Sequence, residues 1–156
     1  MKILGPLLFA LAGVSPATAV ELRGTVISIQ DGDTMTVQVD RQLVKVRLMD
    51  IDAPELKQPF GQQSRQALSV LCAGKAVMID TTSEDRYGRT LARVTCGTTY
   101  ANAELVRQGM AWVFDKYVKD RSLYELQDKA RSVKQGLWAD PKSIAPWEWR
   151  ASKSKK

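Results

Sequence analysis

The sequence predicts an α+β domain in which five short strands form a small barrel and three α-helices accompany it. Three observations support this fold class. Several short segments alternate apolar and polar side chains with the period of two that half-buried strands require. An Asp-Gly pair separates the first two of these segments, and it is a strong signal for a hairpin turn. Apolar residues at helical spacing recur after the third strand and again towards the end of the chain.

The first three strands follow one another closely and predict an antiparallel meander. Asp31-Gly32 is the expected turn between the first and second strands, and Asp40-Arg41 is the expected turn between the second and third. The three strands are predicted at Glu21–Gln30, Met35–Val39 and Leu43–Met49.

The remaining elements complete the barrel and add the helices. They are predicted as a helix at Gly61–Leu71, a strand at Ala76–Asp80, a polar loop at Thr81–Tyr87, a strand at Thr90–Thr95, a helix at Ala103–Gln108 and a helix from Asp120 or Ser122 to about Gln135. Asn102 is the expected N-cap of the second helix. Residues 136–140 and 146–149 are expected to be irregular. Five strands with a helix after the third are typical of a five-stranded OB-fold barrel.

The start of the chain has the composition of a secretory signal peptide. Lys2 supplies a positive charge, Ile3 to Val14 form an apolar run, and Ala17-Thr18-Ala19 is a small-residue cleavage site. An uncleaved anchor is the alternative, but the run is too short to span a bilayer and has no polar face. We therefore expect a secreted or periplasmic protein without a membrane span after cleavage, and nothing in the sequence indicates more than a monomer. The expected division is a signal peptide at residues 1–19, a domain at residues 20–149 and a basic, disordered tail at residues 150–156.

Cys72 and Cys96 are the two cysteines of the chain. In an exported protein the simplest expectation is one disulfide between them. Two buried free thiols are the alternative that the sequence leaves open.

The absence of histidine narrows the chemistry. It excludes histidine acid–base catalysis, Ser-His-Asp and Cys-His triads, and histidine-ligated zinc. The formal net charge of +6 favours polyanionic partners such as nucleic acid or anionic lipid, although basic charge is also ordinary for solubility. Any catalysis must therefore depend on carboxylates, guanidiniums and a hard cation.

Charged side chains gather at the end of the third strand. Arg47 lies on the polar side of that strand, and Asp52 and Glu55 follow within a few residues. Pro54 ends the strand ladder, because proline has no amide hydrogen to donate. Asp33 is a further acid beside the first turn, which turn chemistry alone does not require. A charged surface strand running into a turn would explain the stretch equally well, so this pattern alone does not decide between a site and a surface.

Four segments of the chain fall in the order and spacing of one known family. They are Asp31-Gly32-Asp33-Thr34, Arg47 through Glu55, Asp85-Arg86-Tyr87-Gly88-Arg89 and Leu105-Val106-Arg107-Gln108-Gly109. Together they resemble the staphylococcal nuclease (thermonuclease) family, and the resemblance runs from about Leu22 to Trp138. The closing Gly-Leu-Trp-Ala and Pro-Trp-Glu-Trp segments are similar to the thermonuclease-like secreted proteins of Gram-negative bacteria.

The resemblance implies a Ca²⁺-dependent phosphodiesterase that acts on DNA and RNA and leaves 3′-phosphates. It places the calcium carboxylates at Asp33 and Asp52, and a backbone carbonyl ligand at Ala53, where the staphylococcal enzyme has threonine. It further implies a catalytic set and a nucleotide-binding set. These are Arg47, Glu55 and Arg89 for catalysis, and Tyr87 and Tyr117 for contact with the nucleotide.

The chemistry of these residue types supports the same function. Ca²⁺ binds carboxylate and carbonyl oxygens, guanidiniums bind phosphate oxygens, and a carboxylate can orient or deprotonate water. The expected reaction is in-line attack of water on phosphorus with departure of the 5′-hydroxyl. The alternative from another class is a catalytically silent OB-fold module that binds single strands by stacking and basic charge. Such a module has no use for acids that repel phosphate when no metal is bound.

Overall fold

The computed structural model describes residues 19–154. The predicted signal peptide therefore lies outside the described residues except for its last position, and so do the final two residues of the predicted tail. Among the described residues, no helix combines the length and the apolar character needed to cross a membrane.

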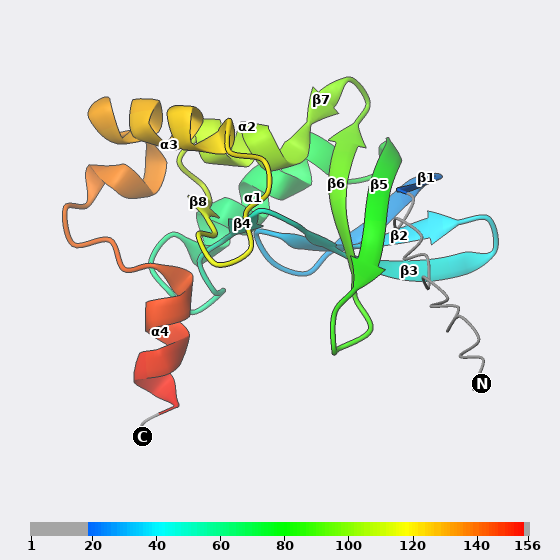
Figure 1. Cartoon of the computed structure of the whole chain (residues 1–156), viewed down its shortest axis with the longest axis horizontal. Coiled ribbons are helices and arrows are strands. Elements are labelled where there is room, and N and C mark those ends of the chain that lie inside the picture. The colour runs from blue at the N-terminus through cyan, green and yellow to red at the C-terminus, as the bar shows by residue number, and fades with distance from the viewer. Residues whose placement is uncertain (1–18, 155–156) are drawn as a thin grey trace, which may run out of the picture.

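Five strands close into a barrel, which confirms the predicted α+β fold with an OB-type barrel (Figure 1). Neighbouring strands run in the order β3-β2-β1-β5-β6, and a pairing between β3 and β6 closes the barrel. That closing pair is parallel and the other four are antiparallel. The strands are β1 Val20–Ile29, β2 Thr34–Val39, β3 Gln42–Leu48, β5 Ala76–Glu84 and β6 Thr90–Cys96.

Three two-residue strands extend this framework. β7 (Thr99–Tyr100) pairs with the end of β6. β4 (Ile51–Asp52) pairs with β8 (Trp112–Val113) in a separate small sheet. The β4–β8 pairing carries the chain that follows β3 towards the helical side of the molecule.

The structure contains four α-helices among residues 19–154, one more than the sequence predicts. They are α1 Gly61–Cys72, α2 Ala101–Arg107, α3 Leu123–Ser132 and α4 Pro146–Lys153, and a 3₁₀ turn, η1, spans Gly136–Ala139. The first three pack together beside the barrel, whereas α4 projects from the rest of the molecule (Figure 1).

The barrel interior is filled by alternate residues of its strands. In the antiparallel pairing of β2 with β3, Met35 lies opposite Val46. Side chains two positions apart point to the same face of a strand, so the inward series is apolar and the residues between its members face outward. The fully buried members of β2, β3 and β6 are Met35, Val37, Val46, Leu48, Ala92 and Val94.

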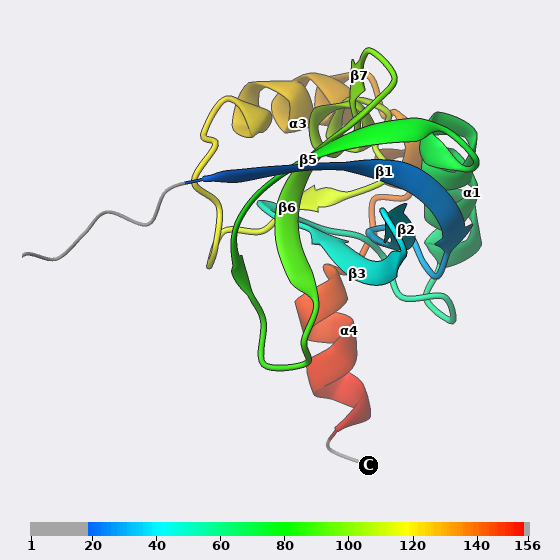
Figure 2. The same ribbon diagram turned by 90° about the vertical axis from the view of Figure 1, so that its right-hand side faces the viewer.

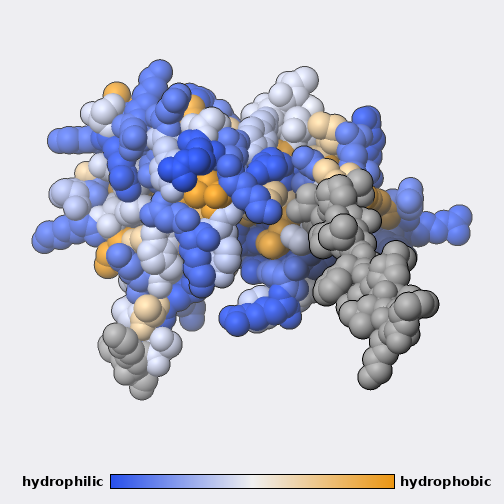
Figure 3. Space-filling model, in the orientation of Figure 1, coloured by the Kyte–Doolittle hydropathy of each residue, from blue (hydrophilic) through white to orange (hydrophobic). Residues whose placement is uncertain are grey.

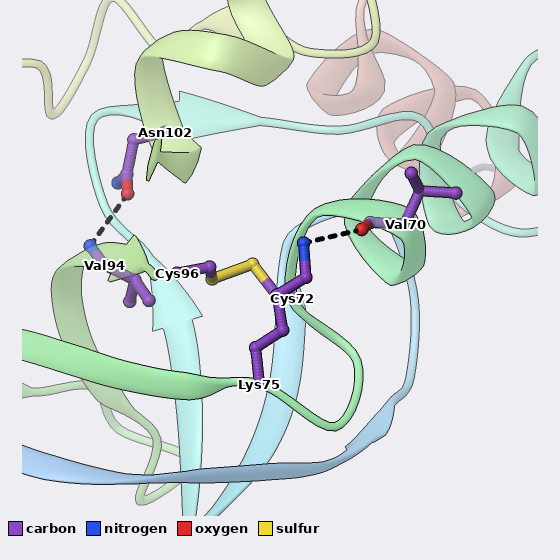
Figure 4. The surroundings of a disulfide bond; sticks show 6 residues. All are labelled: Val70, Cys72, Lys75, Val94, Cys96 and Asn102. Carbon is purple, nitrogen blue, oxygen red and sulfur yellow. Dashed lines mark hydrogen bonds between the residues drawn. A yellow bond between two sulfur atoms is a disulfide. The ribbon is translucent and has the colours of Figure 1, made fainter. Parts of the chain in front are cut away.

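Cys72 and Cys96 form a disulfide that joins the end of α1 to the end of β6 (Figure 4). The sulfur–sulfur distance is 1.99 Å and the cysteines are 24 residues apart in sequence. Closing a loop of this length stabilises a folded domain by about 3 kcal/mol. The helix is therefore fixed covalently to the barrel near the open end of the β5–β6 hairpin.

Two local predictions are wrong. The polar stretch expected as a loop from Thr81 is instead largely strand, because β5 continues to Glu84 and pairs with β6 as far as Thr90. Asn102 is not an N-cap: it lies inside α2, fully buried. Its side chain accepts a hydrogen bond from the Val94 amide at 3.0 Å (Figure 4), so it ties α2 to the barrel.

The end of the chain also differs from the prediction. The stretch expected to be irregular, and the first part of the tail expected to be disordered, form α4 as far as Lys153. Pro146 takes the first helical turn, where the missing amide hydrogen of proline costs nothing. Tryptophans in this part of the chain pack back on the domain: Trp138 and Trp147 both contact Trp112 through their ring edges.

Candidate active site

A left-handed residue between β3 and β4 turns the chain towards the site. Asp50 has a φ of 68°. Its fully buried carboxylate accepts hydrogen bonds from the Arg93 side chain at 2.9 Å and from the Lys119 amide at 2.6 Å. The strain of this backbone conformation is thus held by an ion pair and by a distant loop. The turn leads into β4, which carries Asp52 and pairs with β8.

Arg47 joins the two acids that the resemblance assigns to a metal. Its Nε lies 3.2 Å from Asp33 Oδ1, and its Nη2 lies 3.0 Å from Asp52 Oδ1. These two nitrogens form one edge of the guanidinium, so the two carboxylates meet along that edge. Its Nη1 donates to the carbonyls of Leu48 and Ile51. The Arg47 side chain is only 11% exposed, so this is a buried, nearly saturated hydrogen-bond network.

The close approach of Asp33 to the chain after β4 depends on Gly32. The Ala53 amide donates to Asp33 Oδ2 at 2.7 Å. A Cβ at Gly32 would lie 2.7 Å from the Ala53 Cβ and 2.6 Å from the Ser64 Cβ. Gly32 does not have a positive φ, so it is needed here for this contact rather than for a two-residue hairpin turn. The predicted hairpin is present, but its connection runs through four residues before β2 begins.

Burial shifts the protonation of the acids in this region. Desolvation raises the pKa of Asp52, as does the nearby Asp33 carboxylate, and hydrogen bonds from Arg150 oppose both effects. Desolvation and the charge of Asp33 raise the pKa of Asp31 to about 6. Asp31 accepts a hydrogen bond from the Asp33 amide at 3.1 Å, and so supports the backbone that carries Asp33. The accumulated negative charge is what a bound cation would relieve.

Glu55 stands at the exposed rim of the same cluster, with a side chain that is 41% exposed. Its backbone amide donates a hydrogen bond to Gln58 Oε1 at 3.2 Å. Gln58 also donates to the Ile144 carbonyl at 2.6 Å, which links the loop after β4 to the segment before α4. The Glu55 carboxylate is ion-paired with Arg150 at 2.7 Å. Asp52 and Glu55 are therefore brought to one guanidinium, although Glu55 does not contact Arg47.

Arg89 immediately precedes β6 and is held by Asp85. Its Nε is 2.7 Å from Asp85 Oδ2, and its amide donates to Asp85 Oδ1 at 3.0 Å. Burial works to raise the pKa of Asp85, but the hydrogen bonds from Arg89 and Tyr87 outweigh it and lower that pKa. Among the described residues, Arg89 makes no ion pair with Asp33, Asp52 or Glu55. 

The parallel register nevertheless places Arg89 near Arg47. Thr90 lies opposite Val46 in the β3–β6 pair, and Leu91 lies opposite Arg47. Arg89 immediately precedes Thr90, so its backbone lies beside β3. The strand pairing therefore brings the chain segments that carry Arg47 and Arg89 side by side.

The two predicted nucleotide-contacting tyrosines are exposed side chains on separate loops. Tyr87 is 68% exposed at the β5–β6 turn, and Tyr117 is 57% exposed and packs edge-on against Phe114 at 4.9 Å. The β5–β6 turn and α4 project from the same end of the molecule (Figures 1 and 2). Hydrophilic side chains cover the tip of the β5–β6 hairpin and most of the face drawn in Figure 3.

The donor set fits a hard cation. Asp33 and Asp52 contribute carboxylate oxygens that both contact one edge of the Arg47 guanidinium. The Ala53 amide donates a hydrogen bond to Asp33. Oxygen ligands of this kind are those that calcium prefers. Within residues 19–154, no three acidic or cysteine side chains converge closely enough to hold an ion by themselves. The fit therefore depends on two carboxylates with a backbone carbonyl, while the third acid, Glu55, is ion-paired with Arg150.

Arg150 is the residue of this cluster that the sequence prediction missed. It was expected in a solvated tail, yet it contacts two acids of the site. A weak signal was present in the sequence: Pro146 can begin a helix, and Trp147 and Arg150 are then three residues apart on one helical face.

Known proteins match this chain over most of its length. The family model for staphylococcal nuclease homologues matches residues 45–140. Protein ParB from Escherichia coli is 46% identical over 154 residues, covering 92% of this chain and 86% of that protein. Micrococcal nuclease from Shigella flexneri is 44% identical over 151 residues, covering 89% and 86%. An uncharacterized endonuclease from E. coli O157:H7 is 41% identical over 139 residues, covering 88% and 91%. The family model spans more than half of the chain and each relative aligns with most of it, so this protein belongs to the staphylococcal nuclease family.

Proposed function

We propose that this protein is a calcium-dependent endonuclease that hydrolyses phosphodiester bonds of DNA and RNA outside the cytoplasm and leaves 3′-phosphates. Membership of the staphylococcal nuclease family supports nuclease activity, and so do the names of two relatives, a micrococcal nuclease and an uncharacterized endonuclease. The disulfide between Cys72 and Cys96 supports an oxidising compartment, in agreement with the expected signal peptide.

The observation that carries the proposal is the pair of buried carboxylates that meets at Arg47. Asp33 and Asp52 have side chains only 8% and 2% exposed, and both contact the same guanidinium. Two buried acids in a region that would receive phosphate are costly for a protein that only binds strands. They are useful to a protein that holds a divalent cation there.

Asp33, Asp52 and the Ala53 carbonyl are the groups that would hold calcium. When bound, the ion supplies Lewis-acid stabilisation of the charge that develops on the phosphate oxygens. Arg47 and Arg89 are the guanidiniums available to bind the non-bridging oxygens, each able to form two parallel hydrogen bonds. Such donors gain strength as the transition state gains negative charge.

Glu55 is the carboxylate available to orient or deprotonate the attacking water. It is at the exposed rim, beside Asp52 rather than buried with it, so water can reach its oxygens. Attack in line with the leaving 5′-oxygen would keep the phosphate on the 3′ side of the break. A positioned carboxylate of this kind is typically worth 10²–10⁴ in rate.

Digestion of single-stranded DNA and of RNA by the purified protein tests this function. We expect cleavage with Ca²⁺ and none with a calcium chelator. Arg89→Ala should lower the rate by about 10²–10³ because one charge donor is lost. The matched control is Arg107→Ala, which removes the same charge from an exposed pair on α2. Strand binding without cleavage under every condition would instead favour the catalytically silent OB-fold module.

A near-normal cleavage rate for Glu55→Gln, measured with Ca²⁺ on the same substrates, would remove Glu55 from the mechanism. The substitution keeps the size of the side chain and abolishes its charge. An equal effect of Arg89→Ala and Arg107→Ala would show that general charge, and not the site, governs the rate.

A further inference from the structure

Arg150 occupies the oxygens that the proposed metal would need. Its Nη2 donates to Asp52 Oδ2 at 2.6 Å, and its Nη1 lies 3.3 Å from Asp52 Oδ1 and 2.7 Å from Glu55 Oε1. Asp52 Oδ1 is also held by Arg47 at 3.0 Å. Both carboxylate oxygens of Asp52 are therefore already paired with a guanidinium.

Aromatic packing on α4 explains why Arg150 reaches the site. Trp147 stacks on Phe114, with ring centroids 5.3 Å apart and an interplanar angle of 6°, and contacts Trp112 at 5.8 Å. Trp112 lies directly opposite Asp52 in the β4–β8 pair. Arg150 follows Trp147 by three residues, so the two side chains leave α4 on the same face. The helix is thus anchored at its start with a guanidinium aimed at Asp52.

The charges around this contact are unbalanced without a metal. Three carboxylates, of Asp33, Asp52 and Glu55, face two guanidiniums, of Arg47 and Arg150. Calcium coordinates carboxylate oxygens at 2.3–2.6 Å. A guanidinium hydrogen-bonded to the same oxygen lies in the space that such an ion would take. Arg150 and calcium therefore compete for Asp52.

We propose that Arg150 occupies the calcium site of the metal-free protein and, by competing for Asp52 and Glu55, lowers the affinity of the site for calcium. This inference rests on the proposed calcium-dependent function. Calcium binding then displaces the Arg150 guanidinium and frees Glu55, while Trp147 keeps the start of α4 in place. Arg150 remains at the rim of the site after displacement, because the anchor is less than one helical turn away.

The size of the effect follows from the occupancy of the contact. If Arg150 is paired in about nine of ten metal-free molecules, the competent fraction is about one tenth and the apparent Kd for calcium is raised about tenfold. The Arg150 side chain is 43% exposed, so it can leave for solvent without exposing buried apolar surface.

Calorimetric titration of Ca²⁺ into the metal-free protein, without nucleic acid and at physiological salt, tests the proposal. Arg150→Gln should lower the Kd for calcium about tenfold. Lys153→Gln is the matched control, since it removes one positive charge from the same helix. Lys153 lies over the Trp149 ring at 4.5 Å, and it forms no ion pair with the acids of the site in the described part of the chain. The Kd of the Lys153→Gln variant should stay within about twofold of the wild type, because within residues 19–154 Lys153 makes no direct contact with these acids and salt screens exposed charges.

A second measurement keeps the proposal falsifiable if the heats are small. Because a ligand that binds more tightly stabilises the fold more at the same concentration, the calcium-induced rise in Tm should be larger in Arg150→Gln than in the wild type. Equal Kd values and equal Tm rises in all three proteins would overturn the competition but leave calcium binding intact. Equal tightening in both variants would also overturn it, since general charge would then be the cause. Calcium binding by none of them would overturn both this inference and the calcium-dependent function.

Discussion

Replacement of Arg47 by glutamine should destabilise the protein mainly when calcium is absent. Arg47 is the guanidinium that holds Asp33 and Asp52 together, and its side chain is 11% exposed. Removing one partner from a buried ion pair typically costs about 3–5 kcal/mol, because the remaining charge is left uncompensated. Asp52 keeps its contact with Arg150, so the lower end of that range, about 3 kcal/mol, is expected.

Calcium should reverse much of this loss. A cation between Asp33 and Asp52 compensates the charge that Arg47 no longer neutralises, and without Arg47 the carboxylates are also freer to bind it. We expect the deficit to fall to roughly half, about 1.5 kcal/mol, in saturating Ca²⁺. The chain contains four tryptophans, so urea unfolding in chelator and in Ca²⁺ can be followed by tryptophan fluorescence.

Arg107→Gln is the control for this experiment, since Arg107 pairs with Glu104 on the exposed side of α2. Its effect should be small and equal in both buffers. A loss in Arg47→Gln that is the same with and without calcium would refute the reasoning, because the two acids would then not be the metal site. A negligible loss in chelator would refute the claim that Arg47 supports the buried acids.

Three further predictions concern stability. The double variant Cys72→Ser/Cys96→Ser should lose about 3 kcal/mol of unfolding free energy, measured by urea unfolding. An equal loss in the wild type after addition of reductant would assign this effect to the disulfide. Asp31→Asn should stabilise the metal-free protein at pH 7.5 but not at pH 4. The pKa of Asp31 is raised to about 6 in the fold, so its ionisation costs stability as pH rises from the unfolded value of 3.8 through 6. Partial exposure reduces the expected gain to about 1 kcal/mol, and a gain that is independent of pH would contradict this origin. Gly32→Ala should lower the free energy of unfolding by about 1–3 kcal/mol, because the added methyl group pushes against Ala53 and Ser64. It should also weaken calcium binding measured by calorimetry. Unchanged calcium binding would show that this contact does not shape the site.

The barrel could be predicted from the sequence because its signals are local. Alternation along each strand and the spacing of the turns identify β1, β2 and β3 without knowledge of their partners. The role of Gly32 could not be predicted in the same way. Asp-Gly is a general turn signal, whereas the requirement here comes from Ala53 and Ser64, which lie elsewhere in the sequence.

Elements that depend on tertiary contacts were misjudged. Asn102 has a side chain that often serves as an N-cap. Here that side chain instead makes hydrogen bonds with the backbone of β6 and of Met49. Helix α4 has only eight residues, and an isolated helix of that length is marginal in water. Its stability comes from Trp147 packing on Phe114, which no local pattern reveals.

The candidate site was predicted as a set of residues but not as a network. Family spacing identified Asp33, Asp52 and Glu55, and the structure shows what joins them. Arg150 lies 98 residues from Asp52 in sequence, so its contact with that acid could only be found once the chain was folded. The result is a site in which Arg47 and Arg150 hold positions that the proposed metal would share.

The most direct test of the central claim is cleavage of one defined single-stranded oligonucleotide by the wild type and by Asp52→Asn, with the fragment ends identified by mass spectrometry. The wild type should cleave in Ca²⁺ and not in chelator, and its fragments should carry 3′-phosphates and 5′-hydroxyls. Asp52→Asn should bind the strand and fail to cleave it, with an unchanged circular dichroism spectrum. Cleavage by the wild type that persists in chelator, or full activity in Asp52→Asn, would contradict a calcium site built on these buried acids.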